Sequence, residues 1–165
     1  MKSITEDDFR QQISKFETSF PARKDDTPIS IKIRVDSGCF HREHSPFAYR
    51  EIDLYIYNHP NDNFTFEEHE NGPELILFLS WLTDGIHLSK SVIDFVAVII
   101  KARSDGTRHA DRKSEPIELV IRGLDQHDEY IEIKVLRILP RQTVSRYLIE
   151  KALLSSANKM VQKQK

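Results

Sequence analysis

The spacing of apolar residues along the chain changes repeatedly between the period of a helix and the period of a strand. Residues 92–100, Val-Ile-Asp-Phe-Val-Ala-Val-Ile-Ile, are the most apolar stretch and predict a helix that is buried on most of its circumference. Ser91 and Asp94 supply an N-terminal capping signature, and residues 104–106, Ser-Asp-Gly, supply turn residues at which this helix should end. The polar segments on both sides are expected to fold onto it.

Three other segments have apolar residues at helical spacing. The first begins with a capping-box pattern, the second begins at Pro73, and the third follows Pro140. These predicted helices cover residues 5–17, with Phe9, Ile13 and Phe16; residues 73–83, with Leu75, Ile76, Leu79 and Leu82; and residues 144–157, with Val144, Tyr147, Leu148, Ala152 and Leu153.

Four segments alternate apolar and polar residues with the period of two that is typical of a strand with one wet face. They are residues 29–35, 51–57, 117–122 and 131–136. The first two are expected to form a hairpin across the loop of residues 37–48, and the last two a hairpin across the turn of residues 123–128. The polar connector of residues 104–115 is expected to be mobile.

The predicted element order is therefore α-β-β-α-α-β-β-α. Strands that are wet on one face imply an α+β fold of two layers, with a mainly antiparallel four-stranded sheet and helices on one of its faces. A length of 165 residues, 39% of them hydrophobic and 30% charged, suits a single domain over residues 1–165. Residues 1–28 would form an N-terminal helix and linker, residues 29–157 the core, and residues 158–165 a frayed tail.

Composition also limits where the protein works and what it binds. The N-terminus is acidic where a secretory signal would need an apolar run, and charged residues interrupt the one candidate membrane span. The single cysteine fits a reducing compartment, so a cytoplasmic location is expected. The five glycines form no phosphate-binding loop, and no cofactor is predicted.

Charge is divided unevenly along the chain. Residues 62–74 are acidic and contain no Lys or Arg, whereas residues 134–165 contain eight basic residues and one acid, Glu150. This division predicts an acidic protein partner for the C-terminal segment, or self-association through the acidic loop, with nucleic acid less favoured. A solvated helix face that keeps the protein soluble is the alternative. The candidate interaction residues are Arg137, Arg141, Arg146, Lys151 and Lys159.

A possible metal site lies in the first long loop, where Cys39, His41 and His44 bring three zinc-type donors together and His59 or His69 could add a fourth. Their spacing matches no established zinc motif, so an ordinary exposed loop is the alternative. Cys39 could also be a nucleophile with one of these histidines as its base, although a small, half-buried side chain explains it equally well.

The second hairpin contains Glu132-Ile133-Lys134, preceded by Asp125 and Asp128. Metal-dependent nucleases use an acidic residue with a Glu-x-Lys pair to hold Mg²⁺ and to stabilise charge. An exposed strand face with ion pairs between neighbouring strands produces the same pattern.

The second half of the chain resembles the small effector-associated constant-component domains of bacterial conflict operons. The resemblance is carried by residues 72–82 from Gly72-Pro73-Glu74-Leu75 to Trp81-Leu82, by the apolar helix of residues 92–100, and by the hairpin of residues 117–121 and 130–134. Those domains are thought to act as adaptors that link or recruit effectors. The sequence therefore favours a non-enzymatic interaction or adaptor module, with a metal-dependent nuclease as the alternative.

Overall fold

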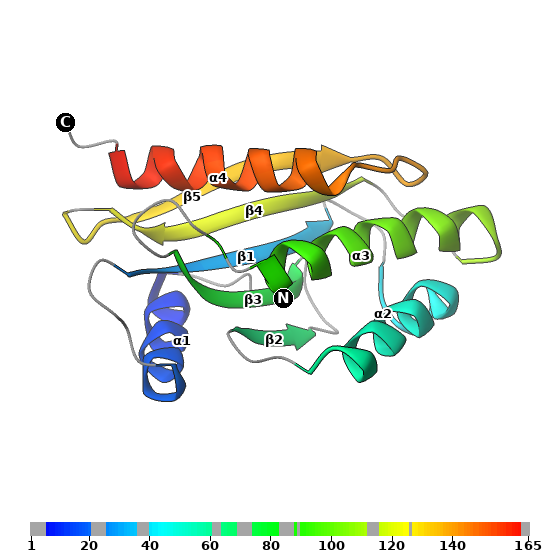
Figure 1. Cartoon of the computed structure of the whole chain (residues 1–165), viewed down its shortest axis with the longest axis horizontal. Helices are drawn as coiled ribbons and strands as arrows, with labels where there is room; N and C mark the ends of the chain where they lie inside the picture. Colours follow the sequence, from blue (N-terminus) through cyan, green and yellow to red (C-terminus); the bar gives the residue numbers. More distant parts are fainter. Residues whose placement is uncertain are drawn as a thin grey trace.

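The computed structural model describes residues 6–20, 26–35, 40–60, 64–68, 74–82, 88, 90–111, 116–125 and 127–162. Within these ranges the fold is α+β, and its elements follow one another in the order α-β-α-β-β-α-β-β-α rather than the predicted α-β-β-α-α-β-β-α (Figure 1). The elements are α1 (Glu6–Ser19), β1 (Thr27–Val35), α2 (Pro46–Asn58), β2 (Thr65–Glu68), β3 (Glu74–Leu82), α3 (Lys90–Arg108), β4 (Ile117–Leu124), β5 (Tyr130–Ile138) and α4 (Arg146–Gln162).

The described strands form one antiparallel sheet in the order β2-β3-β1-β4-β5, so the sheet has five strands rather than the predicted four. The first strand in sequence, β1, lies in the middle of the sheet. Its residue Ile31 is opposite Phe78 of β3 on one side and Ile121 of β4 on the other. The hairpins β2–β3 and β4–β5 therefore flank β1, and the expected hairpin between residues 29–35 and 51–57 does not form.

The main core lies between one face of the sheet and the helices α2, α3 and α4. Side chains at every second position of β1 point into it because successive strand residues face opposite sides. Helices α3 and α4 run along this face, and α2 lies beside α3 (Figure 1). The buried residues include Ile29, Ile31, Ile33 and Val35 of β1, Leu119 and Ile121 of β4, Ile52 of α2, Phe95 and Ile99 of α3, and Ile149 and Leu153 of α4.

The remaining helix, α1, packs on the opposite face of the sheet, so the expectation that all helices share one face is wrong. Phe9 of α1 lies under the guanidinium of Arg122, 5.2 Å from it, and contacts the ring of Tyr130 edge to face. Arg122 is opposite Ser30 in the sheet, on the side away from Ile29 and Ile31. Phe9, Ile13 and Phe16 therefore form a second, smaller apolar cluster on that face.

Residues 51–57 form part of helix α2 and not the predicted strand. Ile52, Leu54 and Ile56 alternate with polar residues, which suggested a strand. The buried positions are instead Ala48, Tyr49 and Ile52, whose spacing of one and three residues is that of a helix face. Burial on that face against α3 outweighs the local alternation.

Residues 74–82 form strand β3, although a helix was predicted for residues 73–83. The sequence Glu-Leu-Ile-Leu-Phe-Leu-Ser-Trp-Leu is a continuous apolar run, which by periodicity alone fits a buried helix or a central strand equally well. The strand prevails here because β3 has hydrogen-bonded neighbours on both sides, β1 and β2.

Helix α3 continues to Arg108 and does not end at residues 104–106 as predicted. Ser104 and Thr107 are buried, and the Ser104 hydroxyl donates a hydrogen bond of 3.0 Å to the carbonyl of Arg141. Beyond the helix, Asp111 is also buried. The first part of the predicted mobile connector is thus packed against the rest of the protein, and its residues 112–115 lie outside the described residues.

Helix α4 extends past residue 157, where a frayed tail was predicted, to Gln162. Met160 is buried in the main core, and this contact explains why the helix continues through a polar sequence. Within the described ranges, no helix combines the length and the apolar character needed to cross a membrane.

Candidate functional site

A connected group of charged side chains lies on the sheet face that carries α1. We call Ser30, Lys32, Arg34, Glu118, Arg122, Glu132 and Lys134 the polar face. Lys32 and Arg122 sit near its centre with 1% and 0% of their surface exposed. Arg122 donates two hydrogen bonds to the Ser30 hydroxyl, at 3.2 and 2.8 Å. A buried charge is costly unless it is paired, so the ion pairs of this face show whether its positive charges are compensated.

Both glutamates of the polar face bridge two cations. Glu132 binds Lys32 at 3.4 Å and Arg34 at 3.0 Å. Glu118 binds Arg34 at 3.1 Å and Lys134 at 3.2 Å. The result is a continuous ionic network across β1, β4 and β5.

The predicted nuclease motif falls within this network. Glu132 and Lys134 each have an ionic partner, but Asp125 and Asp128 lie in the turn between β4 and β5. There the Asp125 carboxylate accepts hydrogen bonds from the backbone N–H groups of His127 and Glu129, and Asp128 binds Arg10 of α1. The described geometry therefore supports the alternative interpretation of the motif, a strand face with cross-strand ion pairs.

The network changes the acidity of Glu132. Partial burial of its carboxyl group would raise the pKa, but the charge of Lys32, the hydroxyl of Tyr130 and the charge of Arg34 outweigh burial, so the pKa of Glu132 lies below its usual value. Tyr130 donates its hydroxyl to Oε2 of Glu132 at 3.1 Å. Glu132 is therefore held as a carboxylate at neutral pH.

We expect Glu132→Gln to destabilise the protein at pH 7, by an amount that shrinks as the pH falls. A carboxyl group whose pKa is lower in the folded state stabilises the fold above its unfolded pKa, and this stability is lost as the pH falls through the folded value. Urea unfolding of parent and variant at pH 7 and at about pH 3 measures the difference. Glu129→Gln, on the exposed neighbouring turn, is the control. A gap between parent and Glu132→Gln that stays constant down to about pH 3 would contradict the ionic role of Glu132.

The predicted metal loop is described only in part. Cys39 lies outside the described residues, and His41 and His44 belong to a turn in which the His41 carbonyl accepts hydrogen bonds from the N–H groups of His44 and Ser45. Across the ranges that the structure describes, no three His, Cys, Asp or Glu side chains come together as a metal site would require. Zinc binding by Cys39, His41 and His44 stays a prediction.

The five basic residues predicted to form one interaction surface lie in three places. Arg137 is opposite Glu118 in the sheet and so shares the polar face, and Arg141 lies in the turn before α4, where its carbonyl accepts hydrogen bonds from α3. Arg146, Lys151 and Lys159 are on α4. Arg146 binds Asp94 of α3 and, at 2.8 Å, Glu150, so it joins the two helices.

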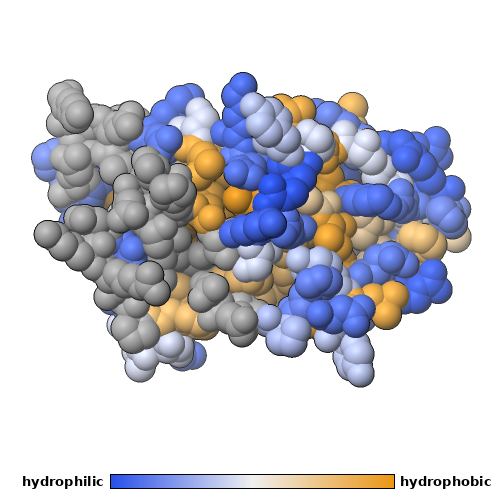
Figure 2. Space-filling model, viewed as in Figure 1, coloured by the Kyte–Doolittle hydropathy of each residue, from blue (hydrophilic) through white to orange (hydrophobic). Residues whose placement is uncertain are grey.

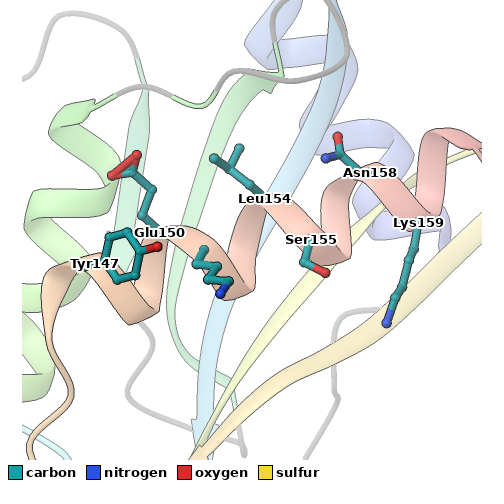
Figure 3. A pocket seen from close by; sticks show the side chains of 7 residues that line it. Tyr147, Glu150, Leu154, Ser155, Asn158 and Lys159 are labelled. Carbon is teal, nitrogen blue, oxygen red and sulfur yellow. The ribbon is translucent and has the colours of Figure 1, made fainter.

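Lys151 and Lys159 line a groove on the outer side of α4, which we call the α4 groove. It has a volume of about 580 Å³. Tyr147, Glu150, Leu154 and Asn158 follow one another at steps of three and four residues, and Lys151, Ser155 and Lys159 form a second row at steps of four. Figure 3 shows Leu154 on one edge of the helix and Ser155 and Lys159 on the other.

The α4 groove combines positive charge with exposed apolar surface. Tyr147, which lines the groove, is 71% exposed. Among the described residues, neither Lys151 nor Lys159 forms an ion pair. The side of the protein with α3 and α4 accordingly shows apolar side chains next to charged ones (Figure 2).

Comparison of the chain with protein-family models, with curated proteins and with solved structures found no match. The site must therefore be interpreted from its own geometry.

Sequence reasoning missed the role of Tyr147 in this groove. Helical spacing groups Tyr147 with the other apolar residues of the predicted last helix, Val144, Leu148, Ala152 and Leu153. The residues that α4 buries are Ile149, Leu153, Ala157 and Met160, at helical spacing. A row drawn through Ile149 and Leu153 would have placed Tyr147 on the opposite, solvent-facing side.

Proposed function

We propose that this chain is a non-enzymatic protein-interaction module that binds a partner protein through the α4 groove. The observation that carries the proposal is the placement of Lys151, Lys159 and the exposed Tyr147 in one groove. Aromatic side chains are enriched in protein interfaces, where a large amphipathic ring buries area at a low entropic cost. Basic residues at the rim attract a partner of opposite charge and accelerate association.

The contacts of the acidic residues near the groove support an acidic partner. Glu150 is the one carboxylate that lines the groove among the described residues, and it is already paired with Arg146. The positive charges of Lys151 and Lys159 are thus left to act on a bound molecule. Arg146 is committed to Asp94 and Glu150 and serves the packing of α3 against α4.

The polar face supports a structural role rather than catalysis. Its two carboxylates, Glu118 and Glu132, each bridge two cations, so their oxygens are engaged within the sheet. An adaptor role in bacterial conflict systems stays a prediction from the family resemblance.

A library of random twelve-residue peptides displayed on phage and selected on the parent protein tests the proposal. We expect enriched peptides to bind the parent and to lose at least about tenfold in affinity when Lys151→Glu and Lys159→Glu are combined, because two attractive rim charges become repulsive. Fluorescence polarisation of the synthetic peptides measures the affinity.

The control combines Lys15→Glu and Arg50→Glu, two exposed positions on α1 and α2, which changes the net charge by the same amount. This double variant should bind as the parent does. Failure to enrich any peptide, or peptides that bind the parent and the Lys151→Glu, Lys159→Glu variant equally, would contradict binding through the α4 groove.

A further inference from the structure

We propose that two copies of the chain pair through the edge strand β5, antiparallel around Ile133, so that their two sheets become one continuous sheet. This surface differs from the α4 groove, so the pairing goes beyond the proposed function and does not depend on it. Three features point to it: the place of β5 in the sheet, the order of charges along β5, and the position of α4 above it.

Strand β5 forms a long edge of the described sheet. It spans nine residues, whereas β2 at the opposite edge spans four. Within the described sheet β5 has a strand neighbour on one side only, β4, so its outward-facing N–H and C=O groups have no strand partner there. Edge strands are often protected from pairing by proline or by charged side chains. β5 contains no proline, and its charged residues Glu132 and Lys134 have opposite signs.

The regular part of β5 ends near Val135. In the ladder with β4, Lys134 is opposite Val120, but Leu136 is opposite Leu119, so Val135 is an extra residue on β5. Such a bulge disrupts the ladder and bends the strand locally. A second strand can therefore pair regularly with residues 130–134, and the centre of a two-fold pair is expected within this segment.

The charges within this segment select one centre. In an antiparallel pair of identical strands, the central residue lies opposite itself. A centre at Glu132 would place two carboxylates opposite each other, whereas a centre at Ile133 places Glu132 of each copy opposite Lys134 of the other. Like charges in these positions destabilise a strand pair and opposite charges stabilise it. The Lys134 side chain is 67% exposed and that of Glu132 is 30% exposed, so both charges can act across the edge.

Helix α4 would meet its copy in the same dimer. It packs on both β4 and β5 and so lies above the space between them, about 2.4 Å inward from β5, which is half the strand spacing. Pairing would bring the two β5 strands to about 4.8 Å from each other. The two α4 axes would then be about 10 Å apart, and packed helices lie 8 to 10 Å apart. One strand pairing therefore also brings the two helices into contact.

The side of α4 that would face its copy has exposed apolar surface. Arg146 binds Asp94 and so marks the side that faces α3. At about 100° per residue, Leu148 and Ala152 lie roughly 200° and 240° around the helix from Arg146, on the side away from α3. Figure 1 shows no described helix on that side of α4. Leu148 is 51% exposed there.

A second copy fits this surface better than a lone peptide strand. Ile131 and Ile133 of β5 are only partly buried beneath α4, and an added strand of any origin would cover them. A lone strand would leave Leu148 exposed, and it would need a base and an acid in the right order to match Glu132 and Lys134. A copy of the chain supplies both that order and a helix that covers Leu148.

Sedimentation velocity from low to high micromolar concentration tests the pairing. We expect the parent to change from monomer to dimer as the concentration rises. Leu148→Lys should raise the dimer dissociation constant at least about tenfold, because the two-fold axis places the new charge twice where apolar side chains meet. Leu54→Lys on α2 is the matched control, since Leu54 and Leu148 are both 51% exposed, and it should leave the dissociation constant unchanged.

A single cysteine at the two-fold axis tests the register. In a chain with Cys39→Ser, Ile133→Cys should form a disulfide between two copies under mild oxidation. Opposite residues of an antiparallel pair have Cα atoms about 4.5 to 5.5 Å apart, and a disulfide joins Cα atoms about 4.4 to 6.8 Å apart. Ile131→Cys is the control on the same face: its two copies would be offset by four residues, roughly 13 Å, and should not link. Non-reducing gel electrophoresis measures the linked fraction, and circular dichroism checks that each variant is folded.

The outcomes separate this pairing from binding at the α4 groove. A parent that stays monomeric at every concentration would overturn the pairing, and so would a dimer that Leu148→Lys leaves intact, because the copies would then meet through another surface. Equal linkage through Ile131→Cys and Ile133→Cys would overturn the centre at Ile133. The phage selection reports on the α4 groove alone, so its failure would leave a dimer through β5 in place.

Discussion

Replacing Phe95 with alanine is expected to cost about 3 to 5 kcal/mol of folding free energy. Phe95 is 4% exposed, and its ring lies 5.1 Å from that of Tyr55 on α2 and 4.9 Å from that of Phe66 on β2. Phe64 adds a third aromatic neighbour at 6.3 Å. Truncation removes the buried ring and leaves a cavity at the point where α2, α3 and the β2 end of the sheet meet, and rigid neighbours of this kind cannot collapse fully to fill it.

Urea unfolding of Phe95→Ala and of the parent measures this cost. Tyr57→Ala is a matched control, because it also removes an aromatic ring from a helix but at a position that is 85% exposed. The control should change stability by less than about 0.5 kcal/mol. Equal midpoints for Phe95→Ala and the parent would show that this aromatic cluster does not hold the two helices and the sheet together.

Replacing Gly106 with alanine is expected to destabilise the protein, although alanine is the better helix former. A Cβ atom at position 106 would lie 2.1 Å from Oδ2 of Asp111. The same carboxylate accepts hydrogen bonds of 2.9 Å from the N–H groups of Phe47 and Ala48 at the start of α2. The Ser45 side chain makes no capping hydrogen bond there, so Asp111 supplies the cap, and a displaced carboxylate would lose it.

A double-mutant cycle tests whether the cost of Gly106→Ala comes from its clash with the Asp111 carboxylate. Asp111→Ala should cost about 2 kcal/mol, the upper end for loss of a helix cap, because two N–H groups lose their charged acceptor. Gly106→Ala should cost about 1 to 3 kcal/mol in the parent, as overpacking does. In the Asp111→Ala background, Gly106→Ala should leave the stability unchanged or increase it by at most about 1 kcal/mol. The clash with the carboxylate is then gone, and only the helix preference of alanine remains. Costs that simply add would show that Gly106 and Asp111 act independently.

The helices and strands whose apolar residues keep one period over a long stretch were predicted correctly. The buried helix around Phe95 and the hairpin of β4 and β5 lie where apolar spacing indicated them, because a long run of one period is compatible with few other structures. The helix of residues 5–17 was found for the same reason. The α+β class and the antiparallel sheet follow directly from these elements.

Two elements were assigned wrongly because their local patterns fit two structures. In α2, Ile52 belongs both to an alternating row with Leu54 and to a helical row with Ala48, and only packing against α3 selects the second. In β3, the continuous apolar run was resolved by the strands on its two sides. A partner that is distant in sequence decided each case, which is why propensity and periodicity could not.

The amino-acid sequence by itself determined the class of fold, the central helix, the second hairpin and the excess of basic residues in the last third of the chain. Only the tertiary structure decided which charges are exposed. Lys32 and Lys151 look alike as polar residues in periodic segments, but α1 packs against the face that contains Lys32, whereas Lys151 points out of α4 into a groove. The physical reason is that periodicity reports which side of an element a residue occupies, and the burial of that side depends on contacts between elements far apart in the chain.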